Sequence, residues 1–174
     1  MMYKFTKIIK SFFLPVSLIL VLTLSRLIPH PYNFTPVIAA GIFSGFYFRQ
    51  FFLVFFVIIL SMFVGDLYLG FHNTMFFTYI ALIVPVSLGI MIKRFRFSEI
   101  LVSGLISSVC FFLVTNFGVW ITLNMYEKNL DGLFASYVLA IPFFHNTLIS
   151  TFLYLILFKL LFDYLLSKEK IIKI

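Results

Sequence analysis

The chain has 174 residues, of which 63% are hydrophobic and only 11% are charged. A water-soluble domain with this composition would expose large apolar patches, so we expect the surrounding solvent to be lipid. The formal charge of +7 does not indicate nucleic-acid binding, because basic residues beside apolar spans serve to orient a membrane protein. At about 20 residues per span, the length leaves no room for a soluble domain. We therefore treat residues 1–174 as a single transmembrane domain.

The first apolar stretch runs from Ser11 to Pro29 and follows a basic segment, Lys4 to Lys10. This order is also typical of a secretory signal, but the nearest small-x-small tripeptide abuts Arg26 and makes a poor cleavage site. We therefore predict that the stretch is the first transmembrane helix.

A turn-rich connection from Pro29 to Phe34 follows, and Thr35-Pro36 then supplies an N-cap and a proline at the first helical position. The second helix reaches only to about Phe48, because Arg49-Gln50 comes next. Such a helix is roughly 20 Å long, against an apolar bilayer core of about 30 Å. It is too short to cross alone, so we expect it to draw the preceding loop into the bilayer.

Three longer spans are predicted next: Phe51 to Gly70, Met75 to Ile92 with a kink at Pro85, and Ile100 to Leu123. In the short second helix, Gly41 to Gly45 forms a GxxxG pattern, which lets one helix approach a neighbour closely.

The most polar loop of the chain runs from Asn124 to Asp131 and is expected to face water. The apolar segment Gly132 to Phe144 is too short to span and contains Pro142, which indicates a re-entrant or interfacial segment. The last predicted helix, His145 to Leu166, is followed by a basic tail. The fold class predicted is thus an all-α integral membrane protein with six transmembrane helices.

Basic residues set the predicted orientation, because positively charged loops stay in the cytoplasm. With six crossings and both ends inside (N-in/C-in), only Arg26 and Lys128 of the 13 lysines and arginines fall on the outer side. An odd number of crossings would destroy this bias.

Under this topology, polar side chains gather near the outer surface. Irregular backbone at membrane depth is tolerated only beside protein or a water-filled cavity, so the loop before the second helix indicates a pocket. Charged side chains in an apolar span usually mark a functional path. We expect an outward-facing site for a small polar or aromatic solute, with the 132–144 segment as a lid. The candidate substrate-binding residues are Arg26, His30, Asn33, Asp66, Asn116, Trp120, His145 and Asn146.

Structural explanations exist for the same residues. Arg26 and Asp66 could form a buried ion pair that only joins the first and third helices, or Arg26 could snorkel to the headgroups. Asn116 and Asn146 could bond helices together, and Trp120 fits an aromatic belt at the membrane interface.

No enzymatic or metal chemistry is predicted. The 3 histidines lack a helical ligand spacing and Cys110 is alone, so we expect neither a metal site nor a cofactor. An intramembrane serine protease also has about six helices, but its Gly-x-Ser-Gly turn fails here because Ile42 stands two residues before Ser44. Ser44 and His145 are also expected at opposite membrane faces, out of hydrogen-bond range. The chain is therefore predicted not to be an enzyme.

Four segments resemble the signature of an uncharacterised bacterial family of membrane transport proteins: Arg26 to Pro36, Asp66 to Gly70, Thr115 to Trp120, and Ala140 to Asn146. That family is similar to the substrate-binding (S) components of energy-coupling factor (ECF) transporters in size, six-helix layout and cytoplasmic ends. The resemblance implies a vitamin or micronutrient bound near the outer face, in a bacterial cytoplasmic (inner) membrane. It also implies a coupling membrane subunit and ATPases as partners.

One feature departs from that pattern: many S components carry an alanine-based docking motif on the first helix, which here has no alanine. The function expected is the membrane-embedded substrate-binding component of a small-molecule importer, with Arg26 and Asp66 fixing a polar group of the solute. The chain has no ATP-binding motif, so a partner would supply energy. The alternatives are a structural or accessory subunit of a membrane complex and a stand-alone facilitator.

Overall fold

A computed structural model of the chain describes the backbone of residues 2–172 and the side chains of residues 15–164 and 167. The described residues form helices joined by short connections and contain no strand, which confirms the all-α prediction. The helices are α1 (Met2–Leu27), α2 (Val37–Phe48), α3 (Phe51–Leu69), α4 (Met75–Ala81), α5 (Ile83–Met91), α6 (Phe97–Thr122), α7 (Leu130–Val138) and α8 (Ile141–Ile172).

Among the residues whose side chains are described, three helices are long and apolar enough to cross a membrane: α3, α6 and the Ile141–Tyr164 part of α8. Shorter apolar helices cover Pro15–Leu27, Val37–Phe48 and Met75–Met91. Helices of this length and composition indicate a membrane protein.

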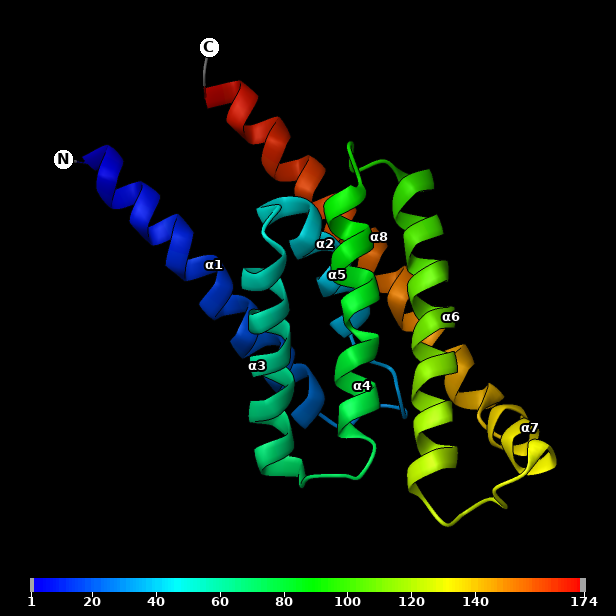
Figure 1. Cartoon of the computed structure of the whole chain (residues 1–174). Coiled ribbons are helices and arrows are strands. Elements are labelled where there is room, and N and C mark those ends of the chain that lie inside the picture. The colour runs from blue at the N-terminus through cyan, green and yellow to red at the C-terminus, as the bar shows by residue number, and fades with distance from the viewer. Residues whose placement is uncertain (1, 173–174) are drawn as a thin grey trace.

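The connections lie at two opposite ends of the helix bundle (Figure 1). Both ends of the chain lie at one end, together with the α2–α3 and α5–α6 connections; we call this the terminal end. The α1–α2, α3–α4 and α6–α7 connections lie at the other end with α7, and we call this the loop end. The α1–α2 connection is set further toward the middle of the bundle than the other two (Figure 1).

Backbone chemistry explains the limits of α2. Proline fixes its own φ near the helical value and lacks an N–H, so it suits a helix start, and α2 follows Pro36 directly. The helix ends at Arg49, which adopts a left-handed φ of 57° and donates its N–H to Gly45 O at 3.1 Å. With 12 residues, α2 is as short as the sequence predicted.

The predicted kink at Pro85 is a full break between α4 and α5. Pro85 cannot donate to the carbonyl of Ala81, and its ring crowds that carbonyl. The helix therefore stops at Ala81, and Leu82 N–H bonds instead to Tyr79 O at 3.2 Å.

Two predicted helix starts were wrong. The last helix begins at Ile141 and not at His145, because Pro142 falls in the first turn, where its missing N–H costs no hydrogen bond. Most of helix α7 falls in the segment from Gly132 that was predicted to be re-entrant or interfacial; it begins at Leu130, because Asn129 caps it by accepting the Gly132 N–H at 2.8 Å. Helix α6 begins at Phe97, three residues before the predicted start.

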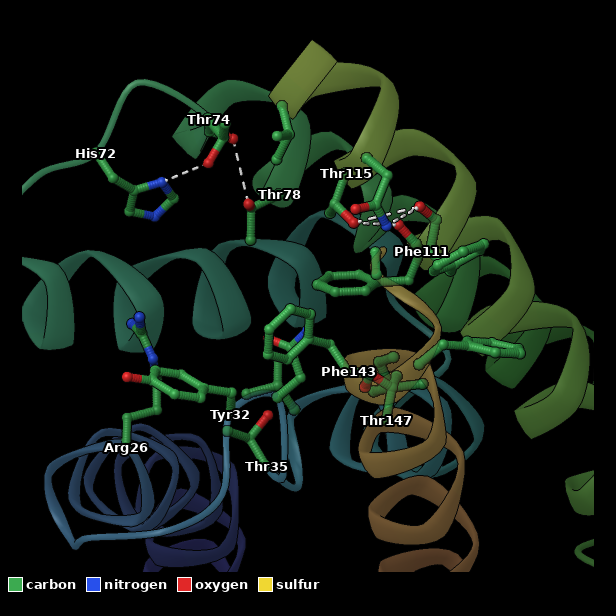
Figure 2. A pocket seen from close by; sticks show the side chains of 18 of the residues that line it. Arg26, Tyr32, Thr35, His72, Thr74, Thr78, Phe111, Thr115, Phe143 and Thr147 are labelled. Atoms are coloured by element: carbon green, nitrogen blue, oxygen red, sulfur yellow. Dashed lines mark hydrogen bonds between the residues drawn. The ribbon is translucent and has the colours of Figure 1, made fainter. Parts of the chain in front are cut away.

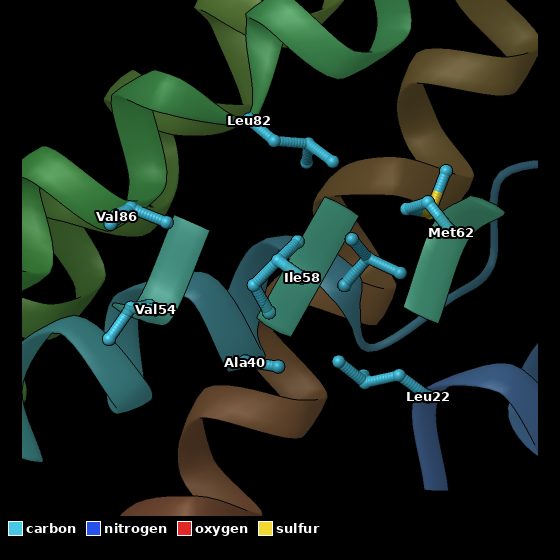
Figure 3. Close-up of a cluster of buried hydrophobic side chains, with 8 residues drawn as sticks. Leu22, Ala40, Val54, Ile58, Met62, Leu82 and Val86 are labelled. Atoms are coloured by element: carbon cyan, nitrogen blue, oxygen red, sulfur yellow. The ribbon is translucent and has the colours of Figure 1, made fainter. Parts of the chain in front are cut away.

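Helix α2 lies at the centre of the bundle, and its residues from Val37 to Ile42 are buried. One apolar cluster includes its side chains and is formed by residues of α1, α2, α3 and α5 together with Leu82, which lies between α4 and α5 (Figure 3). Its buried members are Leu22, Val37, Ala40, Val54, Ile58, Met62, Leu82 and Val86.

Helices α2 and α5 touch through their backbones. A Cβ atom on Gly45 would lie 2.6 Å from Val86 O, and a Cβ atom on Gly89 would collide with Ile42 O. The close approach predicted from the GxxxG pattern is therefore confirmed. Phenylalanines fill the terminal end beside this contact, with rings 4.8 to 6.2 Å apart; they are Phe43, Phe46, Phe95 and Phe162.

Candidate functional site

A cavity of about 780 Å³ lies at the loop end of the bundle. Its lining comes from the three loop-end connections and from α1, α2, α3, α4, α6, α7 and α8. Small-molecule sites typically measure 300 to 1,000 Å³ and combine apolar walls with a few polar groups. The cavity therefore has the size of a binding site for a metabolite.

Arg26 brings the one permanent charge to the described lining of this cavity. It sits in the last turn of α1, and its side chain is 13% exposed. Nη1 donates to Met62 O at 2.7 Å, and Nη2 donates to Asp66 Oδ1 at 2.5 Å. The guanidinium lies against α3 where Gly65 has no side chain, since a Cβ there would come within 2.7 Å of Nη1.

Asp66 lies behind Arg26 and does not line the cavity. Its side chain is 1% exposed, and both carboxylate oxygens are engaged: Oδ1 accepts from Arg26, and Oδ2 accepts from the Tyr79 hydroxyl at 2.6 Å. Buried carboxylates need such partners, because water cannot reach them. The network joins α1, α3 and α4 and holds the guanidinium in place.

The α1–α2 connection packs along α8. Asn146 Nδ2 donates to Tyr32 O at 3.0 Å, and Ser150 Oγ donates to Asn33 O at 3.5 Å. Phe34 makes an edge contact with Tyr154, one full turn further along α8. The connection therefore reaches well inside the bundle, as expected from the short α2.

Hydroxyl groups and aromatic rings face each other across the cavity (Figure 2). On the α3–α4 side, His72 Nδ1 and Thr74 Oγ1 are 2.8 Å apart, and Thr78 Oγ1 donates to Thr74 O at 3.2 Å. On α6, Thr115 Oγ1 and Asn116 Nδ2 donate to carbonyls one turn earlier, both at 2.8 Å. Each of these bonds joins residues of the same segment, so none of them draws a side chain away from the cavity to another helix.

Four of the eight predicted residues line the cavity, namely Arg26, His30, Asn33 and Asn116. The other four do not. Asp66 lies behind Arg26, and Asn146 holds the α1–α2 connection from outside the lining.

Trp120 and His145 also lie away from the cavity. Trp120 Nε1 donates to Glu127 O at 2.9 Å, and the ring lies 6.0 Å from Lys128 Nζ. His145 is exposed on the first turns of α8. Among the described residues, no three His, Cys, Asp or Glu side chains are placed to hold a metal ion.

Sequence reasoning missed most of the hydroxyl and aromatic lining. His72 was not among the candidate residues, yet it lines the cavity. The signal available was the clustering of threonines on segments that also carried predicted site residues. The unpredicted polar and aromatic lining residues include Tyr32, Thr35, Thr74, Thr78, Phe111, Phe112, Thr115, Tyr126, Ser136, Phe143, Phe144, Thr147 and Ser150.

Fold and site together define a helical membrane protein that encloses a metabolite-sized cavity at one end. The chain belongs to DUF6580, a family of unknown function, whose pattern matches residues 6–172. Neither a curated protein nor a solved structure matches it significantly.

Proposed function

We propose that the protein is the membrane-embedded substrate-binding component of a small-molecule importer in a bacterial cytoplasmic (inner) membrane. It binds a vitamin or micronutrient-like solute at the extracytoplasmic face and releases it inside with the help of a coupling membrane subunit and ATPases. The observation that carries the proposal is the cavity of about 780 Å³ with one arginine in its lining. A tightly packed structural subunit has no use for such a space.

The distribution of charge supports an outward-facing cavity. Cytoplasmic loops of membrane proteins are enriched in lysine and arginine. At the loop end, the described basic side chains are Arg26 and Lys128. At the terminal end, they are Arg49, Lys93, Arg94, Arg96 and Lys159. The proposed topology has six crossings with both ends inside, α4 and α5 forming one broken crossing and α7 lying at the outer interface.

In the proposed site, Arg26 contacts the solute, and Asp66 acts through Arg26 by fixing its orientation. Hydroxyl groups and the amides of Asn33 and Asn116 complete the polar contacts, while aromatic rings form the walls. Because Asn146 holds the backbone of the α1–α2 connection, it would keep His30 and Asn33 beside the solute.

Access of an external reagent tests the cavity. Cys110 is the free cysteine, so Cys110→Ser provides a background for Asn116→Cys and for Ser108→Cys, a fully buried position two turns earlier on α6. A neutral, polar thiol reagent added outside intact cells should modify Asn116→Cys and spare Ser108→Cys. Leu130→Cys, at an exposed position, is the positive control that shows the extent of modification at an accessible cysteine.

If both α6 cysteines stay unmodified while the Leu130 variant reacts, the cavity is sealed and the accessory-subunit alternative is correct. Mass spectrometry of small molecules that co-purify with the protein then tests binding directly. Cargo that disappears in Arg26→Ala would support the site. Uptake in cells that lack every coupling ATPase would instead identify a stand-alone facilitator.

A further inference from the structure

We infer that the cavity selects solutes that carry an anionic group, such as a carboxylate, and holds that group on Arg26. This inference rests on the proposed function, because it names the substrate class of the same site. It follows from three observations: the unused donors of Arg26, the charges of the lining, and the position of Asp66.

The first observation is the hydrogen-bond capacity of Arg26. A guanidinium carries five N–H groups in a planar fork. Bonds to Met62 O and Asp66 Oδ1 engage two of them. The remaining donors belong to a side chain that lines the cavity and is 13% exposed. Arginine donors match the paired oxygens of a carboxylate or phosphate better than a single neutral oxygen.

The second observation is that the described lining contains no aspartate or glutamate. Its other ionisable side chains are His30, Tyr32, His72 and Tyr126. None of these side chains carries a carboxylate. A cationic solute would therefore find no partner of opposite charge in the wall, whereas an anionic one meets Arg26.

The third observation is where the neutralising charge lies. Asp66 is 1% exposed and outside the lining, so the Arg26–Asp66 pair presents its positive end to the cavity and its negative end to α3 and Tyr79. Coulomb energy falls with distance, so a bound anion feels the nearer arginine more strongly than the aspartate. The pair therefore attracts anions although its net charge is zero.

The remainder of the lining fits an apolar body with a few hydroxyl or carbonyl groups. Phe111, Phe112, Phe143 and Phe144 supply aromatic walls, and threonines lie among them (Figure 2). Arg26 lies at one side of this space, and Phe111 and Phe143 lie away from it (Figure 2). A solute with an acidic group at one end and an apolar or ring-containing body would span the two sides.

Thiol reagents of similar size that differ in charge test the inference without knowledge of the natural solute. Asn116→Cys and the exposed control Leu130→Cys, both in the Cys110→Ser background, are treated with the sulfonatoethyl, hydroxyethyl and trimethylammonioethyl methanethiosulfonates. Each modification rate is first divided by the rate at which the same reagent modifies a free thiol in solution. The ratio of the anionic to the cationic normalised rate then measures the charge selectivity of the position. Because Arg26 lies nearer to the cavity than Asp66, the ratio at position 116 should exceed the ratio at the control position about threefold to tenfold.

Two substitutions should move this ratio in opposite directions. Arg26→Gln removes the positive end, so the ratio should fall to the control value or below it. Asp66→Asn removes the opposing charge and leaves an amide oxygen for Tyr79, so the ratio should rise above the wild-type value. Arg26→Lys keeps the charge and should keep the preference. If Arg26→Gln does not fold, Asp66→Asn and Arg26→Lys still decide the question.

Equal ratios at positions 116 and 130 would overturn the inference, as would a ratio that Asp66→Asn lowers or leaves unchanged. If the neutral reagent modifies Asn116→Cys without any anion preference, the importer proposal stands and only the substrate class is wrong. If the neutral reagent does not reach Asn116→Cys, both proposals are wrong.

Discussion

The two ends of the bundle are packed in opposite ways, although α2 and α8 contribute to both. At the terminal end, Gly45 and Gly89 bring α2 and α5 into backbone contact, and phenylalanine rings fill the space beside them. At the loop end, the helices enclose a cavity of about 780 Å³. Along α8 the change is direct, because Thr147 and Ser150 line the cavity whereas Leu155 is fully buried in the core.

This contrast shows that residue size and polarity along each helix determine where the helices pack tightly and where they leave a cavity. In lipid, helices gain little from burying apolar surface, and close van der Waals contact holds them together. Glycines at the terminal end permit such contact. At the loop end, the cavity removes it, and the network of Arg26, Asp66 and Tyr79 joins α1, α3 and α4 instead.

The largest expected effect breaks that network. Arg26→Ala leaves the Asp66 carboxylate buried, with the Tyr79 hydroxyl on α4 still bonded to it. Removal of one member of a buried ion pair costs about 3–5 kcal/mol. Denaturant unfolding in detergent micelles measures the loss. The double variant Arg26→Gln/Asp66→Asn should lose less, because no charge remains buried. A single variant as stable as the wild type would show that the loop end needs no such link.

A smaller effect is expected from the glycine contact at the terminal end. A methyl group on Gly89 would collide with Ile42 O, a backbone atom that cannot turn aside. Gly89→Ala should therefore force α2 and α5 apart and destabilise the protein by about 2–3 kcal/mol. Ser87→Ala, at a half-buried position of the same helix, is the control in the same unfolding measurement. Equal stability of the two variants would contradict the tight packing described here.

The smallest effect should come from filling the cavity. Thr115 donates its hydroxyl to Phe111 O within its own helix, so losing this bond leaves no distant group unpaired. Thr115→Leu should change the free energy of unfolding by only about 0.5 kcal/mol, because its larger side chain enters open space. It should also slow modification of Asn116→Cys. A loss as large as that of Gly89→Ala would mean that the space is not free.

The limits of α2 and the interruption at Pro85 were predictable parts of the fold. Pro36 and Arg49 mark the limits of α2, and Pro85 marks the break after Ala81, since proline and glycine chemistry acts locally. Pro142 was misread because a proline can follow the end of one helix or stand in the first turn of the next. Only the residues after it decide between the two positions.

The candidate site was less predictable, because it depends on which helices meet. The sequence indicated that Arg26 and Asp66 lie at similar depth, but not that Tyr79 occupies the second carboxylate oxygen and keeps Asp66 out of the lining. Threonines such as Thr78 look like ordinary interior residues of a membrane helix, where hydroxyls commonly bond their own backbone. The binding roles assigned to the eight candidate residues stay predictions.

The α1–α2 connection is fastened to α8 through its main chain. Asn146 and Ser150 donate to the carbonyl oxygens of Tyr32 and Asn33, and every amino acid has such an oxygen. Asn33 itself has a left-handed φ of 62°, which favours asparagine or glycine, but the bonds to α8 place no demand on the side chains of the other residues of this connection. A change of ligand preference among relatives could thus arise from replacements here alone, without rebuilding the helices that carry them.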